Sequence, residues 1–286
     1  MSTQITTAFV EQYKSNVLHL AQQKGSRLRN AVRNEQVTGK AHWFERIGAA
    51  AAEKRTSRHS DTPRMDTPHS RRKVTMDDYD WADLIDNEDK VRLLISPQSE
   101  YALAGANAMG RAIDSAIIDA ATGNAYDKDG TAVALPSAQK IAHGSANLNL
   151  AKVVQAKQIL DAAEVDPDEE RFMVCTADQI GALLSIEQFT SADYVTVKAL
   201  AQGDINSFMG FTWIRSERLN NASGSDPRKV LAFAKSGMGL AIGADISTKI
   251  SERADKNYAT QVFLSMSIGA TRIEDAKVVE ISCNES

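Results

Sequence analysis

The sequence predicts an α+β fold with one long helix. Apolar residues repeat at helical spacing over 97–122, and a second, shorter helical pattern runs from about 147 to 163. Beyond these helices the chain alternates between short apolar runs that are typical of strands. Hydrophobic residues make up 43% of the 286 residues, which is normal for a globular protein. The length predicts one large domain or two smaller ones.

An amphipathic helix is the first expected element, over residues 7–23. Thr7 can cap its start and Gly25 can end it. Its apolar side chains share one stripe, made by Phe9, Val10, Tyr13, Val17, Leu20 and Ala21. Because this helix precedes any plausible core, it must dock on the body of its own molecule or on a neighbour.

Residues 53–75 form a polar segment with almost no large apolar side chains and no helical period. Pro63 and Pro68 favour extended backbone at the threonine before each of them. A segment without a core-facing side has little use in a compact domain, and long structureless loops are usually functional or disordered. As a hairpin with arms of ~15 residues it could reach ~50 Å, at ~3.3 Å per residue. We therefore expect a loop that crosses onto an adjacent subunit.

Charge is divided unevenly along the chain. Of 33 Lys and Arg, 14 lie in residues 1–75 with 6 Asp and Glu, whereas the remainder has 19 basic and 31 acidic residues. Seven acids crowd into residues 77–89: Asp77, Asp78, Asp80, Asp83, Asp86, Glu88 and Asp89. Such density is costly unless the acids are solvated or matched by cations, and the basic loop just upstream, or its copy on another subunit, is a natural match. The alternatives are a basic arm that touches nucleic acid and two solvated surfaces that merely differ.

This charge pattern predicts a subunit interface. Its basic members are Arg58, Arg64, Arg71, Arg72 and Lys73, and its acidic members are Asp77, Asp78 and Asp80. The hypothesis is that the loop lies across a neighbouring subunit and that these two sets pair between copies.

Helix and strand signals mark the rest of the chain. The long helix begins at Ser96–Pro97 and stops at Gly123–Asn124. Asp178 is the expected cap of a short helix that runs to Leu184. Strands are expected over Arg171–Thr176, Phe211–Arg215, Lys229–Ala234, parts of Thr260–Ile273 and Ala276–Cys283.

A search for catalytic and metal-binding patterns finds none with the required spacing. The five histidines (His19, His42, His59, His69 and His143) show no H-x-H or H-E-x-x-H pattern, and neither C-x-x-C nor G-x-S-x-G occurs. The glycines of 237–243 are spaced one residue too widely for a dinucleotide loop, so a turn or close backbone packing is expected there. Asp127–Gly130 fits an Asp-Gly turn better than a calcium loop. We expect no catalytic, cofactor-binding or metal-binding residues, and no enzyme.

Cysteine usage and hydropathy bear on the compartment. Cys175 and Cys283 each sit in an apolar run, where a thiol usually acts as a small hydrophobe, which favours a reducing cytoplasm. No signal peptide is visible, and no run approaches the ~20 apolar residues of a membrane span. We expect a soluble protein made in the cytosol, with no membrane partner.

The order of these features resembles the HK97-type major capsid proteins of tailed phages, over nearly the whole chain. The matching stretches are Phe9–Tyr13, Gln22–Leu28, Asp78–Asp86, Arg111–Asp114, Phe208–Phe211 and the closing Gly269–Ile281. The resemblance implies an N-terminal arm over 1–50, an extended E-loop over 51–90 and a P-domain over 91–139 with its spine helix at 97–122. An A-domain over 140–245 and P-domain return strands with a final strand over 246–286 complete the implied fold.

The resemblance further implies a function. Copies of the chain would assemble in the host cytoplasm into hexamers and pentamers of an icosahedral shell that encloses the phage genome in the virion. Portal and decoration proteins, a separate scaffold or none, and non-specific contact with packaged DNA are the other implied partners. The rival interpretations are an encapsulin-like compartment, a non-specific nucleic-acid-binding protein that uses the basic N-terminal region, and an unrecognised enzyme.

Overall fold

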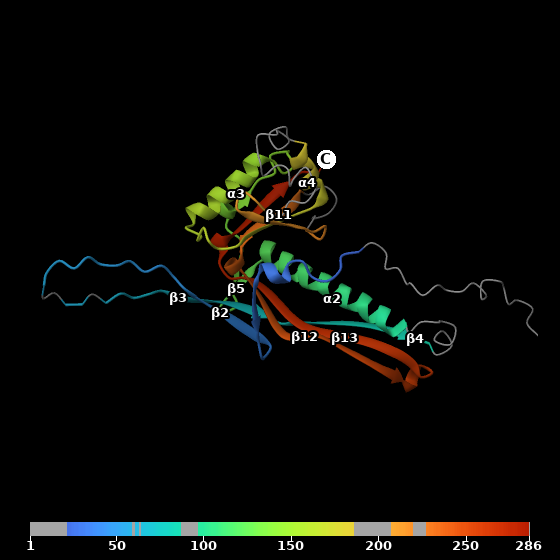
Figure 1. The fold of residues 1–286 in the computed structure, drawn as a ribbon. Coiled ribbons are helices and arrows are strands. Elements are labelled where there is room, and N and C mark those ends of the chain that lie inside the picture. Colours follow the sequence, from blue (N-terminus) through green and yellow to red (C-terminus); the bar gives the residue numbers. More distant parts are fainter. Residues whose placement is uncertain are drawn as a thin grey trace, which may run out of the picture. The chain divides into compact units, whose positions relative to one another are not determined.

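The structure is a computed structural model that describes residues 22–58, 61–62, 64–86, 97–185, 207–219 and 227–285 (Figure 1). Most of the helix expected over 7–23 lies outside the described residues, and residues 22–23 are not helical. Contacts between residues divide the chain into two compact units. One unit comprises the described parts of residues 1–26, 78–112 and 244–267, and the other comprises the described parts of 27–77, 113–243 and 268–286.

The long helix α2 spans Pro97–Thr122, as the sequence predicts. It stops at Gly123, whose amide donates to the Asp119 carbonyl at 2.8 Å. The side chains that α2 buries fall at helical spacing and include Met109, Ile113, Ile117, Ile118 and Ala121. None of the helices in the described ranges is long and apolar enough to cross a membrane.

Two further helices begin at capped positions. Helix α3 spans Leu150–Ala162, and Asn149 caps it by accepting from the Lys152 amide at 3.0 Å. Helix α4 spans Ala177–Leu184, and its cap is Thr176, so the expected cap at Asp178 is wrong. Thr176 and Gln179 form a capping box, whereas Asp178 already lies in the first turn, where its charge suits the helix dipole.

A six-stranded sheet carries most of the strands that the sequence predicts. Its order is β7-β14-β11-β8-β10-β9. The strands are β7 (Lys140–Ile141), β8 (Arg171–Cys175), β9 (Ser207–Phe208), β10 (Phe211–Arg215), β11 (Arg228–Ala234) and β14 (Val278–Cys283). Strand β14 starts two residues later than expected because Asp275–Lys277 forms a 3-10 turn. Every residue of β8 is buried, as expected for a central strand.

A four-stranded sheet, in the order β2-β3-β5-β6, includes the last residues of the polar segment 53–75. Its strands are β2 (Ala41–Ile47), β3 (His69–Thr75), β5 (Ala125–Asp127) and β6 (Ala132–Val133). Strands β2 and β3 are antiparallel in seven residue pairs, from Ala41–Thr75 to Ile47–His69. The expectation that all of 53–75 lacks regular structure is therefore wrong for residues 69–75.

Beyond β2 and β3 the described residues of 48–68 run as two long arms, and we call residues 48–68 the hairpin loop (Figure 1). The Gly48 amide donates to the Pro68 carbonyl at 2.8 Å and closes its base. None of the described residues of the loop belongs to a strand.

A second four-stranded sheet has the order β1-β12-β13-β4. Its strands are β1 (Arg33–Gln36), β4 (Asp77–Ile85), β12 (Met238–Arg253) and β13 (Ala259–Arg272). The close packing expected at the glycines of 237–243 is found at Gly239 in β12, where a Cβ would lie 2.7 Å from the ring of Phe44, and a 3-10 turn ends at Gly237 just before the strand. Strand β13 buries alternate residues, Val262, Leu264, Met266 and Ile268, as a half-buried strand should.

The acidic strand β4 is held against α2 by its aromatic side chains. A Cβ on Gly105 of α2 would lie 2.6 Å from a ring carbon of Trp81 and 2.7 Å from Leu264. Only glycine leaves room for Trp81 there, so this helix position fixes which face of β4 points inward.

Candidate assembly interface

The hairpin loop presents two of the expected interface residues to solvent. Arg58 and Arg64 are both exposed, and within the described ranges no ion pair engages either of them. Nearby, Arg55 folds locally and donates to the Ser57 carbonyl at 2.7 Å. Among the described residues, the loop therefore offers two cations that have no acidic partner.

Strand β3 separates the next three expected residues by its alternation. Arg71 and Lys73 share the outward face, where Arg71 is exposed and pairs with Glu45 at 2.8 Å. Arg72 points the other way, is only 4% exposed, and forms an ion pair with Asp275. Burial lowers the pKa of Arg72, and the charge of Asp275 opposes that shift. Arg72 belongs to its own subunit's interior, so its place in the expected interface is corrected.

The three expected acids lie at the start of β4, which is the edge strand of its sheet. Asp77, Asp78 and Asp80 are all exposed. Asp78 and Asp80 share a face with Ala82 and Leu84, which are also exposed, while the opposite face carries the half-buried Tyr79 and Trp81. Asp78 and Asp80 thus lie on what we call the acidic outward face of β4, whereas Asp77 falls by alternation on the face of Tyr79 and Trp81.

A buried arginine that the sequence did not single out joins the loop root to α2. Arg272 is fully buried and donates to Asp275 at 2.7 Å, so Asp275 is shared with Arg72. The other donors of Arg272 reach main-chain carbonyls: Gly123 at 2.6 Å, Val133 at 2.9 Å, Ala121 at 3.1 Å and Ala120 at 3.3 Å. Three of these carbonyls end α2, where the helix dipole favours a cation. The Arg-x-x-Asp spacing of 272 and 275 is the only signal that could have revealed this contact.

Asp114 of α2 fixes the segment that follows the N-terminal region. Its carboxylate is fully buried and accepts from the amides of Arg27 and Leu28 at 3.0 Å. Seven residues earlier in α2, the Asn107 side chain accepts from the Gly25 amide at 3.0 Å. Positions 107 and 114 are seven residues apart and lie on the same side of a helix. Side chains of α2 therefore set where residues 25–28 run.

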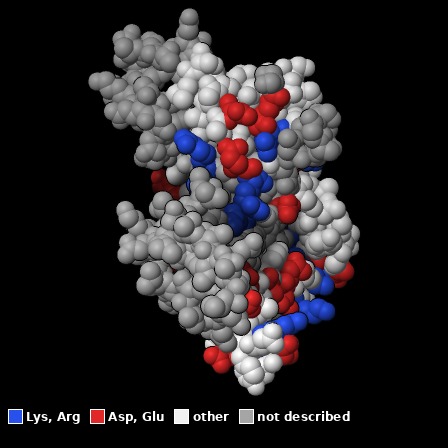
Figure 2. Space-filling view, turned by 90° about the vertical axis from the view of Figure 1, so that its right-hand side faces the viewer, with Lys and Arg blue, Asp and Glu red and all other residues white. Residues whose placement is uncertain are grey.

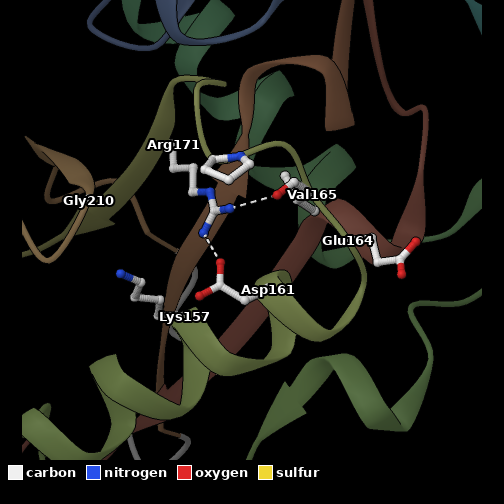
Figure 3. Close-up of a pocket in the computed structure, with 7 residues that line it drawn as sticks. Lys157, Asp161, Glu164, Val165, Arg171 and Gly210 are labelled. Atoms are coloured by element: carbon white, nitrogen blue, oxygen red, sulfur yellow. Dashed lines mark hydrogen bonds and ion pairs between the residues drawn. The ribbon is translucent and has the colours of Figure 1, made fainter.

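A pocket of about 440 Å³ opens beside α3 and the start of β8 (Figure 3). Arg171, at its centre, donates to Asp161 at 2.5 Å and to the Val165 carbonyl at 2.9 Å. These contacts tie the end of α3 to the sheet. None of the described residues that line the pocket is a serine, cysteine or histidine. Among the described residues no group of three or more His, Cys, Asp or Glu could hold a metal ion.

The two thiols should be unreactive in the folded protein. Both are buried, and burial raises the pKa of Cys175 to about 12 and that of Cys283 to about 11. At pH 8 both therefore stay protonated and covered, and a thiolate is the reactive form. A thiol reagent should label neither residue in native protein and both in urea. Rapid labelling without denaturant would contradict this burial.

Solved structures with the same fold come from phages and from a GTA particle. The capsid of the cyanophage P-SCSP1u matches with a TM-score of 0.70 and 19% identity, over 96% of this chain and 93% of that chain. A structure from Mycobacterium phage Che8 matches with a TM-score of 0.69 and 18% identity, over 93% and 94%. The capsid of a native GTA particle matches with a TM-score of 0.71 and 12% identity, over 96% and 95%. No curated protein matches the sequence significantly.

The fold is therefore that of a shell-forming capsid subunit, and the expected α+β capsid architecture is confirmed. The model of the family described as "Phage capsid protein" matches residues 5–285, and the chain belongs to that family. Family and fold together make it a major capsid protein whose copies form a multimeric shell.

Proposed function

We propose that this protein closes an icosahedral shell around a phage genome by laying its hairpin loop across a neighbouring copy. The supporting observation is the hairpin loop itself, because the described residues of 48–68 extend from a paired root and have no strand partner in the described chain. An extended, polar segment that packs against nothing in its own subunit can gain contacts by binding to a second molecule.

The proposed contact is electrostatic. Arg58 and Arg64 on the loop, with Arg71 and Lys73 at its root, face acids of the neighbour, of which Asp77, Asp78 and Asp80 are exposed. Complementary charge of this kind selects the correct partner and register more than it adds affinity. A specific interface typically buries ~1,600 Å² in total, which an extended loop can supply.

We assign the remaining domains and partners by analogy with the capsid protein family. Most of the hairpin loop lies within the proposed E-loop over 51–90, which stands between an N-terminal arm over 1–50 and a P-domain over 91–139. An A-domain over 140–245 gathers at the centres of hexamers and pentamers, and residues 246–286 return to the P-domain. The role is structural rather than catalytic, the site of action is the virion, and the subunits assemble in the host cytoplasm. A portal, decoration proteins and a scaffold are the proposed partners.

A nucleic-acid-binding protein is a less favoured function. Such a protein usually presents a surface of one sign, because it neutralises several phosphates at once. On the face shown in Figure 2, Lys and Arg lie among Asp and Glu. Contact with packaged DNA remains compatible with the shell function but does not define it.

Neutralising the loop should weaken particles and leave the subunit folded. In the double variant Arg58→Ser and Arg64→Ser, we expect a lower particle yield and dissociation at lower salt, because two exposed cations that serve only the neighbour are lost. Particle yield by negative-stain microscopy and sedimentation measures the first effect, and urea unfolding of the subunit should stay unchanged.

The matched control is Lys128→Ser. Lys128 is also exposed, but it pairs with Asp129 in its own turn at 2.6 Å. Particles of the control should resemble the wild type. Wild-type salt resistance in the loop double variant would refute the proposed contact.

A further inference from the structure

The outward face of the sheet β2-β3-β5-β6 carries an aromatic–lysine–aromatic row. Register places Trp43 of β2 opposite Lys73 of β3, and Lys73 opposite Tyr126 of β5. Residues that face each other across antiparallel strands have Cβ atoms about 5 Å apart on the same side. Lys73 therefore stands between the two aromatic side chains.

These aromatic side chains are not part of the core. Trp43 is 42% exposed, Tyr126 is 47% exposed, and Ile47 at the end of β2 is 69% exposed. The opposite face of the same strands is the buried one, with Phe44 and Val74 in the core. A cluster of exposed aromatic and aliphatic side chains around a cation is typical of a protein–protein contact.

The row is followed along the strands by two further pairs. Glu45 stands opposite Arg71, and Ile47 stands opposite His69. Along β3 the two cations Lys73 and Arg71 are two residues apart, which is about 6.6 Å in a strand. The partner of this face should therefore be an extended segment with two anions at the same spacing, one that meets Lys73 and one that shares Arg71 with Glu45.

Strand β4 has that spacing on its exposed face. Asp78 and Asp80 are two residues apart, and Ala82 and Leu84 continue the same face. An antiparallel placement of β4 that sets Asp78 on Lys73 and Asp80 on Arg71 brings Ala82 and Leu84 toward Ile47. A parallel placement of β4 would carry Leu84 away from Ile47. The apolar positions therefore select the antiparallel orientation.

The acids must come from a second copy. Strand β4 follows β3 after one residue, Met76, and a one-residue link is too short to fold β4 back over the face of β3. We infer that the face formed by Trp43, Lys73, Tyr126, Arg71 and Ile47 receives the acidic outward face of β4 from a second copy of the chain. This inference rests on the proposed shell assembly and names a contact at the root of the loop.

Charge reversal with rescue tests the pairing. Lys73→Glu and Asp78→Lys should each lower particle yield at least tenfold, since each places like charges together. The double variant, which restores opposite charges in reversed order, should recover most of the wild-type yield. Circular dichroism and urea unfolding of each subunit show whether the variants fold.

A mispaired double variant supplies the control. Lys73→Glu combined with Asp168→Lys alters an exposed acid that lies outside the proposed interface, so its particle yield should stay as low as that of Lys73→Glu alone. Equal yields from the two double variants, or wild-type yields from folded single variants, would overturn the inference. Failure of the wild-type protein to form particles would instead refute the proposed shell function.

Discussion

Replacing Arg272 with methionine should lower the free energy of unfolding by about 3–5 kcal/mol, as removal of one partner from a buried ion pair does. The guanidinium is fully buried and satisfies Asp275 together with the carbonyls at the end of α2. Methionine fills much of the volume but donates no hydrogen bond, so those carbonyls lose their partner in the interior. Urea unfolding of the purified subunit measures the loss.

Arg253→Met is the matched control for this prediction. Arg253 also pairs with an aspartate, Asp255, at 2.7 Å, but both side chains are exposed near the turn between β12 and β13. Water replaces a surface contact of this kind, so the control should unfold like the wild type. Equal stability of the Arg272 and Arg253 variants would show that the buried contact contributes nothing.

Replacing Asp114 with alanine should cost about 3 kcal/mol of unfolding free energy, because it leaves the amides of Arg27 and Leu28 without their acceptor. Leu28 is itself fully buried, so water cannot easily replace the carboxylate. The segment that leads to the N-terminal region should also become sensitive to protease near residue 27. Urea unfolding and limited proteolysis measure the two effects.

Asp114→Asn and Asp119→Ala complete this series. Asparagine keeps one acceptor oxygen, so its effect should lie between the wild type and alanine. Asp119 lies on the same helix but is exposed, so its replacement should change stability little. A protease-resistant, fully stable Asp114→Ala variant would refute the role of this carboxylate.

The long helix could be predicted from sequence to the residue because every local signal agrees there. Pro97 suits a first turn, apolar residues keep helical spacing, and Gly123 suits a stop. The strands β8, β10, β11 and β14 were predicted to within two residues, because buried strands are short apolar runs with clear ends.

Strands β3 and β4 were not predicted, for a physical reason. In both strands more buried and more exposed positions alternate, but charged residues occupy some of the more buried positions, so the alternation is visible only from tertiary contacts. In β3 the buried positions are Arg72 and Val74, and in β4 Trp81 packs against Gly105. A single-sequence reading places arginine outside, and only the partner carboxylate of Asp275, about two hundred residues away, explains its burial.

The candidate interface was partly accessible from sequence. Charge density identified Arg58, Arg64, Asp78 and Asp80, which the structure places on the surface. The row of Trp43, Lys73 and Tyr126 was not visible, because it depends on the register of three strands from distant parts of the chain.

The paired strands β2 and β3 and the unpaired hairpin loop beyond them should differ in stiffness. Seven residue pairs stiffen β2 and β3, while the described residues of 48–68 belong to no ladder. In a closed shell the curvature differs between pentamers and hexamers. Because every copy has the same sequence, each subunit must adapt its conformation to its position. Tilting the distal part of the loop breaks no interstrand hydrogen bond, whereas tilting the root would break several, each worth about 1 kcal/mol. Adaptation to local curvature should therefore concentrate beyond Gly48 and Pro68.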